Sequence, residues 1–599
     1  MNTSSHFPTV RRSALAGLVA LAVAGCALVT GDPDAPEEEA VPDRIDAPAL
    51  AEGASDATRD GRAAELLTEA EARLRADDPA GALRVTRQIR DDLATASGTV
   101  RVLWVEARAR EAEESFPEAD RAATEYVDRA GEADPMAPAA RLLSARVRFS
   151  GGLDEAYEAL FQVPEGAPSE VRDDALALAR DRAASLDDPV LRDLVSEAPP
   201  HAWLLPVFQV EWATRRGLLG ERDRARELAE AALGLEPAED EERRARAIME
   251  DEFEPRGTVT GTMGLILSME GSPSIRQLSE QIRNGVEIAL LAEGIRGGVR
   301  LESLEDRGET GGARTAARRV VDAGALGLVG PVSDPAFRAV AGEVGGQMAV
   351  ISPVAGERPD TEGVLTLAGI DPEAPRELAR MARDMGVEAV GIVHSSALEE
   401  RTEARWFREA FEEMGGRIHA TRSWSEGDRV FDDAFEGLMG TSPPSVVIFS
   451  SPDEAELIAP LLRVWGLRDL DGPILASSSW ASEAVLGSVP ARHTDGILSV
   501  APHVGAGYGP GWDAFVQRYE DHFRRSLRNP VAGLGHDAAA LLLEAARLGG
   551  DSPGEVVAGL RSIDGFAGAT GTFRWRDDRI VRVHYPVRIE DGRRVGVRD

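Results

Sequence analysis

At 599 residues with 43% hydrophobic content, the chain is long enough for more than one domain. Its formal net charge of −36 makes nucleic acid a poor partner, because an acidic surface repels phosphate. The sequence contains no lysine, which excludes a Walker A lysine, a Schiff-base lysine and a Ser-x-x-Lys nucleophile pair.

The first 25 residues have the pattern of a secretory signal. Arg11-Arg12 precede an apolar stretch from Ser13 to Ala24. At about 1.5 Å per residue, this stretch is too short to span a bilayer as a helix. We therefore expect residues 1–25 to be a signal peptide that is removed.

Small residues stand directly before Cys26, the only cysteine of the chain. Val23-Ala24-Gly25-Cys26 resembles the bacterial lipobox, which implies that Cys26 becomes a lipidated N-terminus. The alternative is an ordinary signal peptide with a chance cysteine. A lipidated thiol leaves no disulfide, no thiolate metal site and no cysteine nucleophile. Ala27 after the cysteine favours the outer membrane, facing the periplasm, over anchoring in the inner membrane.

Residues 26–60 are rich in Asp, Glu, Pro and Ala and contain few large apolar side chains. Such a segment buries too little apolar surface to offset the entropy of ordering, so it predicts a disordered tether.

Residues 61–254 are rich in Ala, Leu and Arg, with apolar residues at helical spacing, and predict paired helices. Ala123, Ala130 and Pro135 recur 102 residues later as Ala225, Ala232 and Pro237, at three times the 34-residue tetratricopeptide period. Tyr157 and Pro164 interrupt the pattern. We expect a degenerate helical solenoid like that of tetratricopeptide repeats, and a non-repeating helical bundle is the alternative.

In residues 255–599 the hydrophobic period changes. Short apolar strands alternate with helical patterns from Thr262 to Ile351 and again from Pro372 to Val500. This alternation predicts two α/β lobes, each a parallel sheet with helices on both faces. The segment from Gly568 through Ile589 predicts a terminal hairpin.

Several segments of this half resemble type I periplasmic binding proteins of the branched-chain amino-acid-binding class. The resembling segments are Gly264–Leu267, Arg283–Ala289, Leu304–Asp306, Gly330–Ser333, Ile351–Ala355, Gly535–Ala538 and Gly565–Gly571. The resemblance implies a bilobed domain that closes over a small ligand such as an amino acid.

Ligands of open α/β sheets lie beyond the carboxyl ends of the strands, where backbone amides at helix starts attract anions. Two groups of serines stand at such strand ends, so we expect them to line the cleft: Ser333 and Ser352 in the first lobe, and Ser450, Ser451, Ser477 and Ser478 in the second. In the resembled class the first-lobe hydroxyls and amides hold a ligand carboxylate. Helix capping is the alternative role for each serine. Glu357 would repel a carboxylate, and Asp453 and Glu483 are candidates to receive an amine.

The order of the parts adds a second resemblance. A lipid-anchored tether, a tetratricopeptide-like solenoid and a type I binding-protein domain together resemble the penicillin-binding protein activator lipoproteins, which contact peptidoglycan synthases from the outer membrane. The resemblance implies a scaffold or regulator of such a synthase. The alternative is a solute receptor that delivers an amino acid or a similar molecule to an ABC permease.

An enzyme is the least favoured class. The sequence has no His-Glu-x-x-His pattern, no metal-ligand spacing and no Gly-x-Ser-x-Gly elbow. We therefore expect no catalytic residues, no metal and no cofactor.

Overall fold

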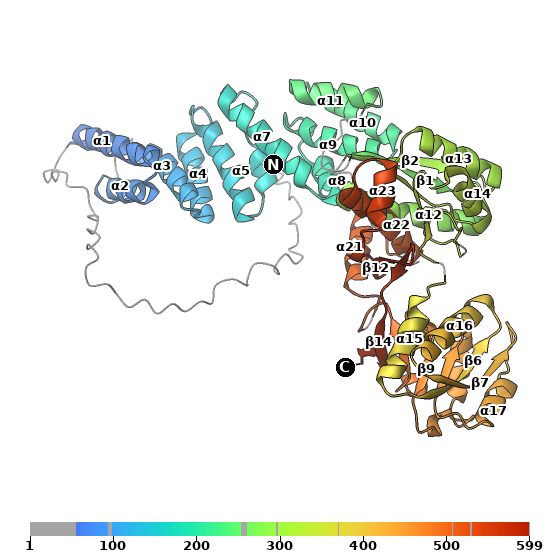
Figure 1. Cartoon of the computed structure of the whole chain (residues 1–599). Coiled ribbons are helices and arrows are strands. Elements are labelled where there is room, and N and C mark those ends of the chain that lie inside the picture. The colour runs from blue at the N-terminus through green and yellow to red at the C-terminus, as the bar shows by residue number, and fades with distance from the viewer. Residues whose placement is uncertain are drawn as a thin grey trace, which may run out of the picture. The chain divides into compact units, whose positions relative to one another are not determined.

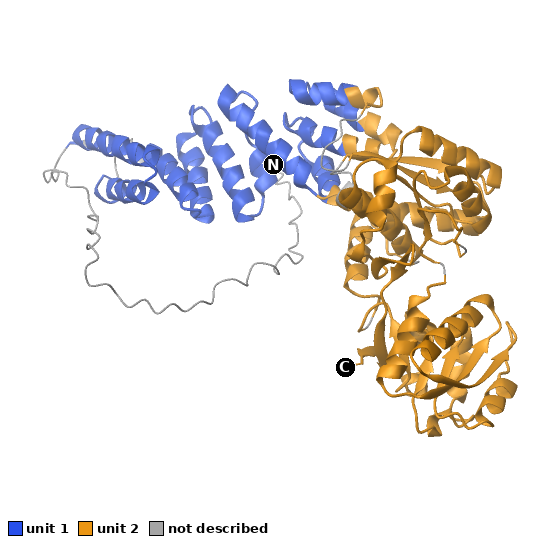
Figure 2. Cartoon of the chain, viewed as in Figure 1, with its two compact units in different colours: residues 1–186, 190–212, 228–246 blue, residues 187–189, 213–227, 247–599 orange. Residues whose placement is uncertain are grey.

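The computed structural model describes residues 55–93, 99–252, 260–294, 298–356, 358–368, 370–505, 507–527 and 530–597. The expected signal peptide, Cys26 and nearly all of the expected tether lie outside these residues. The chain divides into two compact units (Figure 2). Unit 1 comprises residues 1–186, 190–212 and 228–246, and unit 2 comprises residues 187–189, 213–227 and 247–599. Within the described residues, no helix combines the length and apolar character needed to cross a membrane.

The N-terminal part is helical, as its composition predicts. Its helices are α1 (Asp56–Arg75), α2 (Pro79–Asp92), α3 (Thr99–Ala112), α4 (Phe116–Ala130), α5 (Ala137–Gly151), α6 (Ala156–Phe161), α7 (Ser169–Ser185), α8 (Asp188–Glu197), α9 (Leu205–Leu218), α10 (Arg222–Leu233) and α11 (Glu239–Met249). Consecutive helices from α1 to α6 pack together, and the pairs α1 and α3, α3 and α5, and α5 and α7 also touch (Figure 1). Small residues allow this packing; Ala123 of α4, for example, is fully buried.

The first lobe of unit 2 is built on a five-stranded parallel sheet in the order β2-β1-β3-β4-β5. Its strands are β1 (Gly261–Leu267), β2 (Val299–Glu305), β3 (Gly327–Val329), β4 (Ala349–Ser352) and β5 (Val364–Thr366), and its intervening helices are α12 (Pro273–Ala289), α13 (Thr310–Asp322) and α14 (Asp334–Val344). Most residues of these strands are buried, as expected for a sheet covered on both faces.

The second lobe is built on a seven-stranded sheet in the order β15-β14-β10-β9-β8-β6-β7. The parallel strands are β6 (Ala389–Ser395), β7 (Arg417–Trp424), β8 (Val446–Phe449), β9 (Ile474–Ala476) and β10 (Leu498–Ala501). Two antiparallel strands complete the sheet, β14 (Tyr585–Glu590) and β15 (Arg593–Gly596). The helices are α15 (Glu373–Asp384), α16 (Leu398–Glu413), α17 (Asp432–Met439), α18 (Pro452–Ile458), α19 (Glu483–Ser488) and α20 (Ala491–Thr494). The strand–helix alternation predicted for both lobes is confirmed.

After β10 the chain returns to the first lobe. It forms α21 (Pro510–Phe523), α22 (Val531–Gly549), α23 (Pro553–Leu560) and a three-stranded antiparallel sheet of β11 (Asp564–Ala567), β12 (Thr572–Arg576) and β13 (Arg579–Arg582). Phe573 of β12 and Leu542 of α22 share one core with Leu265 of β1. The predicted terminal hairpin is confirmed in part: β12 and β13 pair antiparallel, with Phe573 opposite Arg582, but β14 does not continue this hairpin and pairs instead with β10 of the other sheet.

Two glycines allow α12 and α22 to approach closely. A Cβ atom added at Gly285 would lie 1.8 Å from the carbonyl oxygen of Ala532, and one added at Gly535 would lie 2.4 Å from that of Ile282. Both glycines belong to segments that resemble periplasmic binding proteins. Glycine is required at both positions for steric reasons, because a side chain at either one would collide with the backbone of the facing helix, which cannot rotate away as a side chain can.

A group of ionisable side chains is buried inside unit 2. Arg216 lies 3.0 Å from Asp188 and 3.5 Å from Glu287, and Nε2 of His522 lies 2.7 Å from Glu287. Burial lowers the pKa of His522, but its hydrogen bonds with Asp188 and Glu287 outweigh burial, so the pKa of His522 is raised overall. Asp188 and Glu287 thus face both Arg216 and His522, and a third, less buried carboxylate, that of Glu221, lies 3.4 Å from Arg216.

Replacing Gly285 tests the helix contact. We expect Gly285→Ala to lower the free energy of unfolding by about 3 kcal/mol, because the methyl group forces the two helix backbones apart. Gly342→Ala is the matched control: Gly342 lies within α14 with open space where its Cβ would stand, so alanine is expected to be neutral or slightly stabilising. Equal effects of the two changes in urea unfolding would contradict the steric argument.

Candidate functional site

The two first-lobe serines follow β3 and β4, and each makes a structural hydrogen bond. Ser333 caps α14, its Oγ accepting from the backbone N–H of Ala336 at 3.4 Å. Ser352 is fully buried; its Oγ donates to the carbonyl of Pro331 at 2.7 Å and accepts from the N–H of Ala355 at 3.0 Å. Ser352 thus ties together the loops that follow β3 and β4. Glu357, expected to repel a carboxylate, lies outside the described residues.

The second-lobe serines also make structural bonds. Ser451 caps α18 in a capping box with Glu454. Ser450 is buried, and its Oγ accepts from the indole N–H of Trp480 at 2.9 Å. Ser477 shares a hydrogen bond of 2.8 Å with Ser479, whose Oγ also donates to the carbonyl of Ser450. Ser478 is the half-buried first residue of the 3₁₀ turn Ser478–Ala481.

Ser333 and Ser451 thus have the capping role that the sequence left open, whereas Ser352, Ser450 and Ser477 hold neighbouring loops together, and none of these bonds tests ligand binding. A capped helix still presents backbone N–H groups at its start, where an anion is favoured. Because α14 begins at Asp334, directly after β3, its first turn stands at the carboxyl edge of the first sheet. The expected roles of the serines toward a ligand stay predictions.

The acidic residues at the end of β2 accept hydrogen bonds from the neighbouring loops. Glu305 accepts the backbone N–H of Met269 at 2.8 Å, and the fully buried Asp306 accepts from Ser268 Oγ at 2.6 Å and from the N–H of Gly308 at 2.7 Å. Burial raises the pKa of Asp306 above its usual value. These carboxylates therefore hold the loops after β1 and β2 in place through hydrogen bonds.

Neither sequence candidate for receiving an amine is well placed. Glu483 pairs with the buried Arg594, and Asp453 is exposed in the first turn of α18. A different carboxylate, that of Glu403 on α16, the helix that follows β6, has an unusual electrostatic environment. Burial, together with the nearby carboxylates of Glu399, Glu400 and Asp371, raises the pKa of Glu403 to about 8. An ammonium group beside Glu403 would relieve this repulsion. Sequence reasoning missed Glu403 because its burial and its closeness to Asp371 arise only in the fold.

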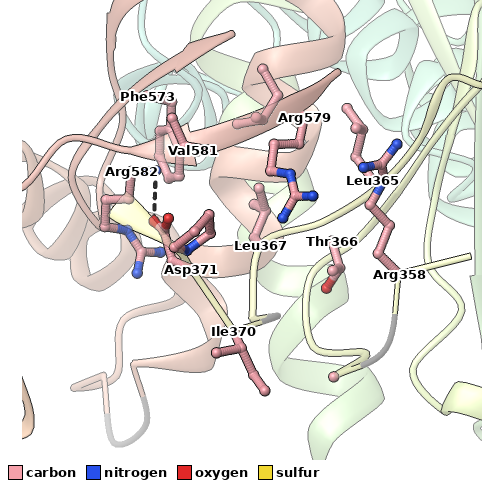
Figure 3. A pocket seen from close by; sticks show the side chains of 13 residues that line it. Arg358, Leu365, Thr366, Leu367, Ile370, Asp371, Phe573, Arg579, Val581 and Arg582 are labelled. Carbon is pink, nitrogen blue, oxygen red and sulfur yellow. Dashed lines mark hydrogen bonds between the residues drawn. The ribbon is translucent and has the colours of Figure 1, made fainter. Parts of the chain in front are cut away.

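A pocket of about 170 Å³ lies in unit 2 between the end of β5, the segment after it and the β12–β13 hairpin (Figure 3). Its lining residues are Gly356, Arg358, Leu365, Thr366, Leu367, Ile370, Asp371, Pro372, Phe573, Arg579, Ile580, Val581 and Arg582. None of the six expected serines contributes to it. The Asp371 carboxylate accepts the backbone N–H of Arg582 at 3.0 Å, as the dashed line in Figure 3 shows, and that of Glu373 at 2.8 Å.

The chain matches known proteins through its C-terminal half. A family model described as periplasmic binding protein matches residues 260–594. A solved structure described as a putative branched-chain amino acid ABC transporter from Rhodospirillum rubrum is 21% identical, with a TM-score of 0.50, and the match covers 57% of this chain and 100% of the other. This likeness shows the shared fold.

Two further solved structures match over the same share of this chain. A leucine-binding protein from Thermotoga maritima is 21% identical with a TM-score of 0.40, and 98% of its chain is covered. A branched-chain amino acid substrate-binding protein from Streptococcus pneumoniae, in complex with isoleucine, is 19% identical with a TM-score of 0.40, and 100% of its chain is covered. Both matches cover 57% of this chain. No curated protein matches the sequence significantly.

Glu403 gives the site a pH dependence. The pKa of Glu403 is about 8 in the folded state, above its ordinary value of 4.5, so the folded state holds the proton more tightly than the unfolded state does. The free energy of unfolding therefore falls as the pH rises from 4.5 to 8. We expect Glu403→Gln to raise the melting temperature by about 2 °C at pH 9 and to leave it nearly unchanged at pH 5. Glu413→Gln, an exposed position at the end of the same helix, is the control. A gain at both pH values would contradict the assignment.

Proposed function

The chain belongs to the periplasmic binding protein family, and we propose that its C-terminal domain binds a small solute on the periplasmic side of the membrane without transforming it. The observation that carries the proposal is the pair of parallel sheets, because ligands of open α/β sheets bind beyond the carboxyl ends of the strands. Ser333 and Ser352 stand at those ends in one lobe, and Ser450, Ser451 and Ser477 in the other.

The chemistry of the strand ends supports an amino-acid-like ligand. The start of α14, capped by Ser333, favours a carboxylate. Glu403 follows β6 of the second lobe and lies among other carboxylates, an environment that favours an ammonium group. A ligand carrying both charges would satisfy both lobes. The solved relatives described as leucine-binding or holding isoleucine support the same class of solute.

Thermal stabilisation across a panel of amino acids tests the proposal. At about 100 times its dissociation constant, a bound ligand adds about 2.7 kcal/mol to the free energy of unfolding. We expect at least one amino acid to give this shift, to be recovered unchanged, and to bind at least tenfold more weakly to Glu403→Gln. Ser552→Ala removes a helix-capping serine that follows α22 and should leave binding unchanged. A panel with no shift would overturn the proposal.

A second candidate function rests on the helical part. The match with the Rhodospirillum rubrum protein uses the whole of that protein but only 57% of this chain. The helices of residues 55–252 are therefore an addition to the shared fold. The stacking of alternate helices supports a tetratricopeptide-like solenoid that holds a protein partner. Together with the order of the parts, it supports a scaffold for a peptidoglycan synthase, as in penicillin-binding protein activators. Co-purification of a synthase that survives replacement of Ser333 and Ser352 would favour this role, and co-purification of an ABC permease would favour solute import.

We also propose that a lipid at Cys26 anchors the protein, in the outer membrane and facing the periplasm. The small residues before this cysteine and the apolar segment preceding them support the anchor. Cys26→Ala should shift the protein from the membrane fraction to the soluble fraction. Retention of the variant in membranes after a carbonate wash would contradict the lipid anchor.

A further inference from the structure

We propose that the pocket between β5 and the β12–β13 hairpin is a second binding site, separate from the strand-end serines, and that it takes a small organic acid. The carboxylate would lie between the guanidinium groups of Arg358 and Arg579, and the apolar part would pack against the walls of the pocket (Figure 3). The Arg582 side chain lines the same pocket, but its guanidinium group lies on the other side of Asp371 and donates to Thr570. The inference goes beyond the proposed function, which assigns no role to these residues.

The pocket arginines differ from their neighbours in lacking carboxylate partners. Outside the pocket, Arg574 and Arg576 of β12 both pair with Glu373, at 3.0 and 2.7 Å. In the described part of the chain, Arg358, Arg579 and Arg582 make no ion pair within 4 Å. Glu373 thus forms close ion pairs with the arginines outside the pocket, whereas those inside it have only more distant carboxylates around them.

The hydrogen bonding of these arginines is also incomplete. Arg358 donates one bond to the carbonyl of Val364 at 3.1 Å, and Arg582 donates one to Thr570 Oγ1 at 3.2 Å. The Nε atoms of Arg579 and Arg582 are buried with no partner among the described residues. A buried donor without a partner costs free energy, which a ligand with acceptor oxygens would recover.

The electrostatic environment favours an anion. Burial lowers the pKa of Arg358, and the charge of Arg579 lowers it further, whereas Asp360 and Asp578 act in the opposite direction. Burial likewise lowers the pKa of Arg582, against the effects of Asp537 and Asp371. Guanidinium groups stay protonated in proteins. The lowered pKa values of Arg358 and Arg582 therefore indicate that their positive charges are partly removed from water. Among the described residues that line the pocket, three are arginines and Asp371 alone is acidic.

The walls select an organic acid over an inorganic anion. Leu365, Leu367, Phe573, Ile580 and Val581 are all buried and line the pocket. Arg582 lies over the ring of Phe573, 5.3 Å from its centre, so charge and apolar surface are adjacent. At roughly 30 Å³ for each water-sized group, the volume accommodates about six non-hydrogen atoms. A short carboxylic acid has this size and both kinds of surface.

Titration calorimetry with sodium pentanoate tests the site, with inorganic phosphate at matched ionic strength as the second probe. We expect the full chain to bind pentanoate and Arg579→Gln to bind it at least tenfold more weakly. Arg576→Gln, which removes a paired arginine outside the pocket, should bind as the unmodified protein does. Equal binding by Arg579→Gln and the unmodified protein, absence of pentanoate binding, or tighter binding of phosphate would each overturn the proposal.

Two further measurements separate this site from the proposed function. Glu403→Gln should retain pentanoate binding, and Arg579→Gln should retain any stabilisation by amino acids. Loss of pentanoate binding in Glu403→Gln would overturn the separation of the two sites. The melting temperature of Arg579→Gln without ligand checks folding, and we expect it to be unchanged or higher because the variant removes an uncompensated buried charge.

Discussion

The contact between α12 and α22 is the constraint on which the C-terminal half depends. It joins a helix near the start of this half to one that follows all the parallel strands, and it exists because Gly285 and Gly535 have no side chains. The first lobe is therefore completed by chain that has already built most of the second. As a result the chain passes between the lobes three times, after β5, after β10 and after β13.

Asp537 holds the returning chain in place. Its buried carboxylate accepts the backbone N–H groups of Ala569 and Thr570, at 2.6 and 2.7 Å, and the hydroxyl of Thr570 at 2.6 Å. A Cβ at Gly568 would collide with this carboxylate, so the glycine before the loop is also required. The segments at 535–538 and 565–571, which carried part of the resemblance to periplasmic binding proteins, form one structural unit that fixes the hairpin of β12 and β13.

Much of this architecture follows from sequence because buried parallel strands are short apolar runs between amphipathic helices. The runs that became β1 to β4 and β6 to β10 were found this way, whereas the three-residue strand β5 (Val364–Thr366) was missed. The sequence did not show that β13 and β14 belong to different sheets. Val581 and Val587 both lie in short strand-forming segments, and only their pairing partners in the fold differ. The serines were placed at the correct strand ends, but sequence alone could not show their hydrogen bonds.

The pocket escaped sequence analysis for a different reason. Arg358 lies 221 residues before Arg579 in the chain, and Arg582 follows three residues later. Because the sequence is rich in arginine throughout, these three do not stand out from the others. What distinguishes these arginines is that none of them forms an ion pair within 4 Å in the described part of the chain, whereas Glu373 pairs with Arg574 and Arg576. Such a difference in pairing arises only when segments from both ends of the domain meet.

The acidic character of the chain makes this local charge important. With a formal net charge of −36, the protein as a whole repels anions, and diffusing organic acids gain nothing from its average field. At physiological salt, however, that field is screened beyond about 8 Å, whereas a partly desolvated guanidinium group acts on its immediate neighbours with little screening. An acidic protein can therefore bind an anion where positive groups without close carboxylate partners are held partly out of the solvent, and the arginines of the β5 to β13 pocket meet this condition.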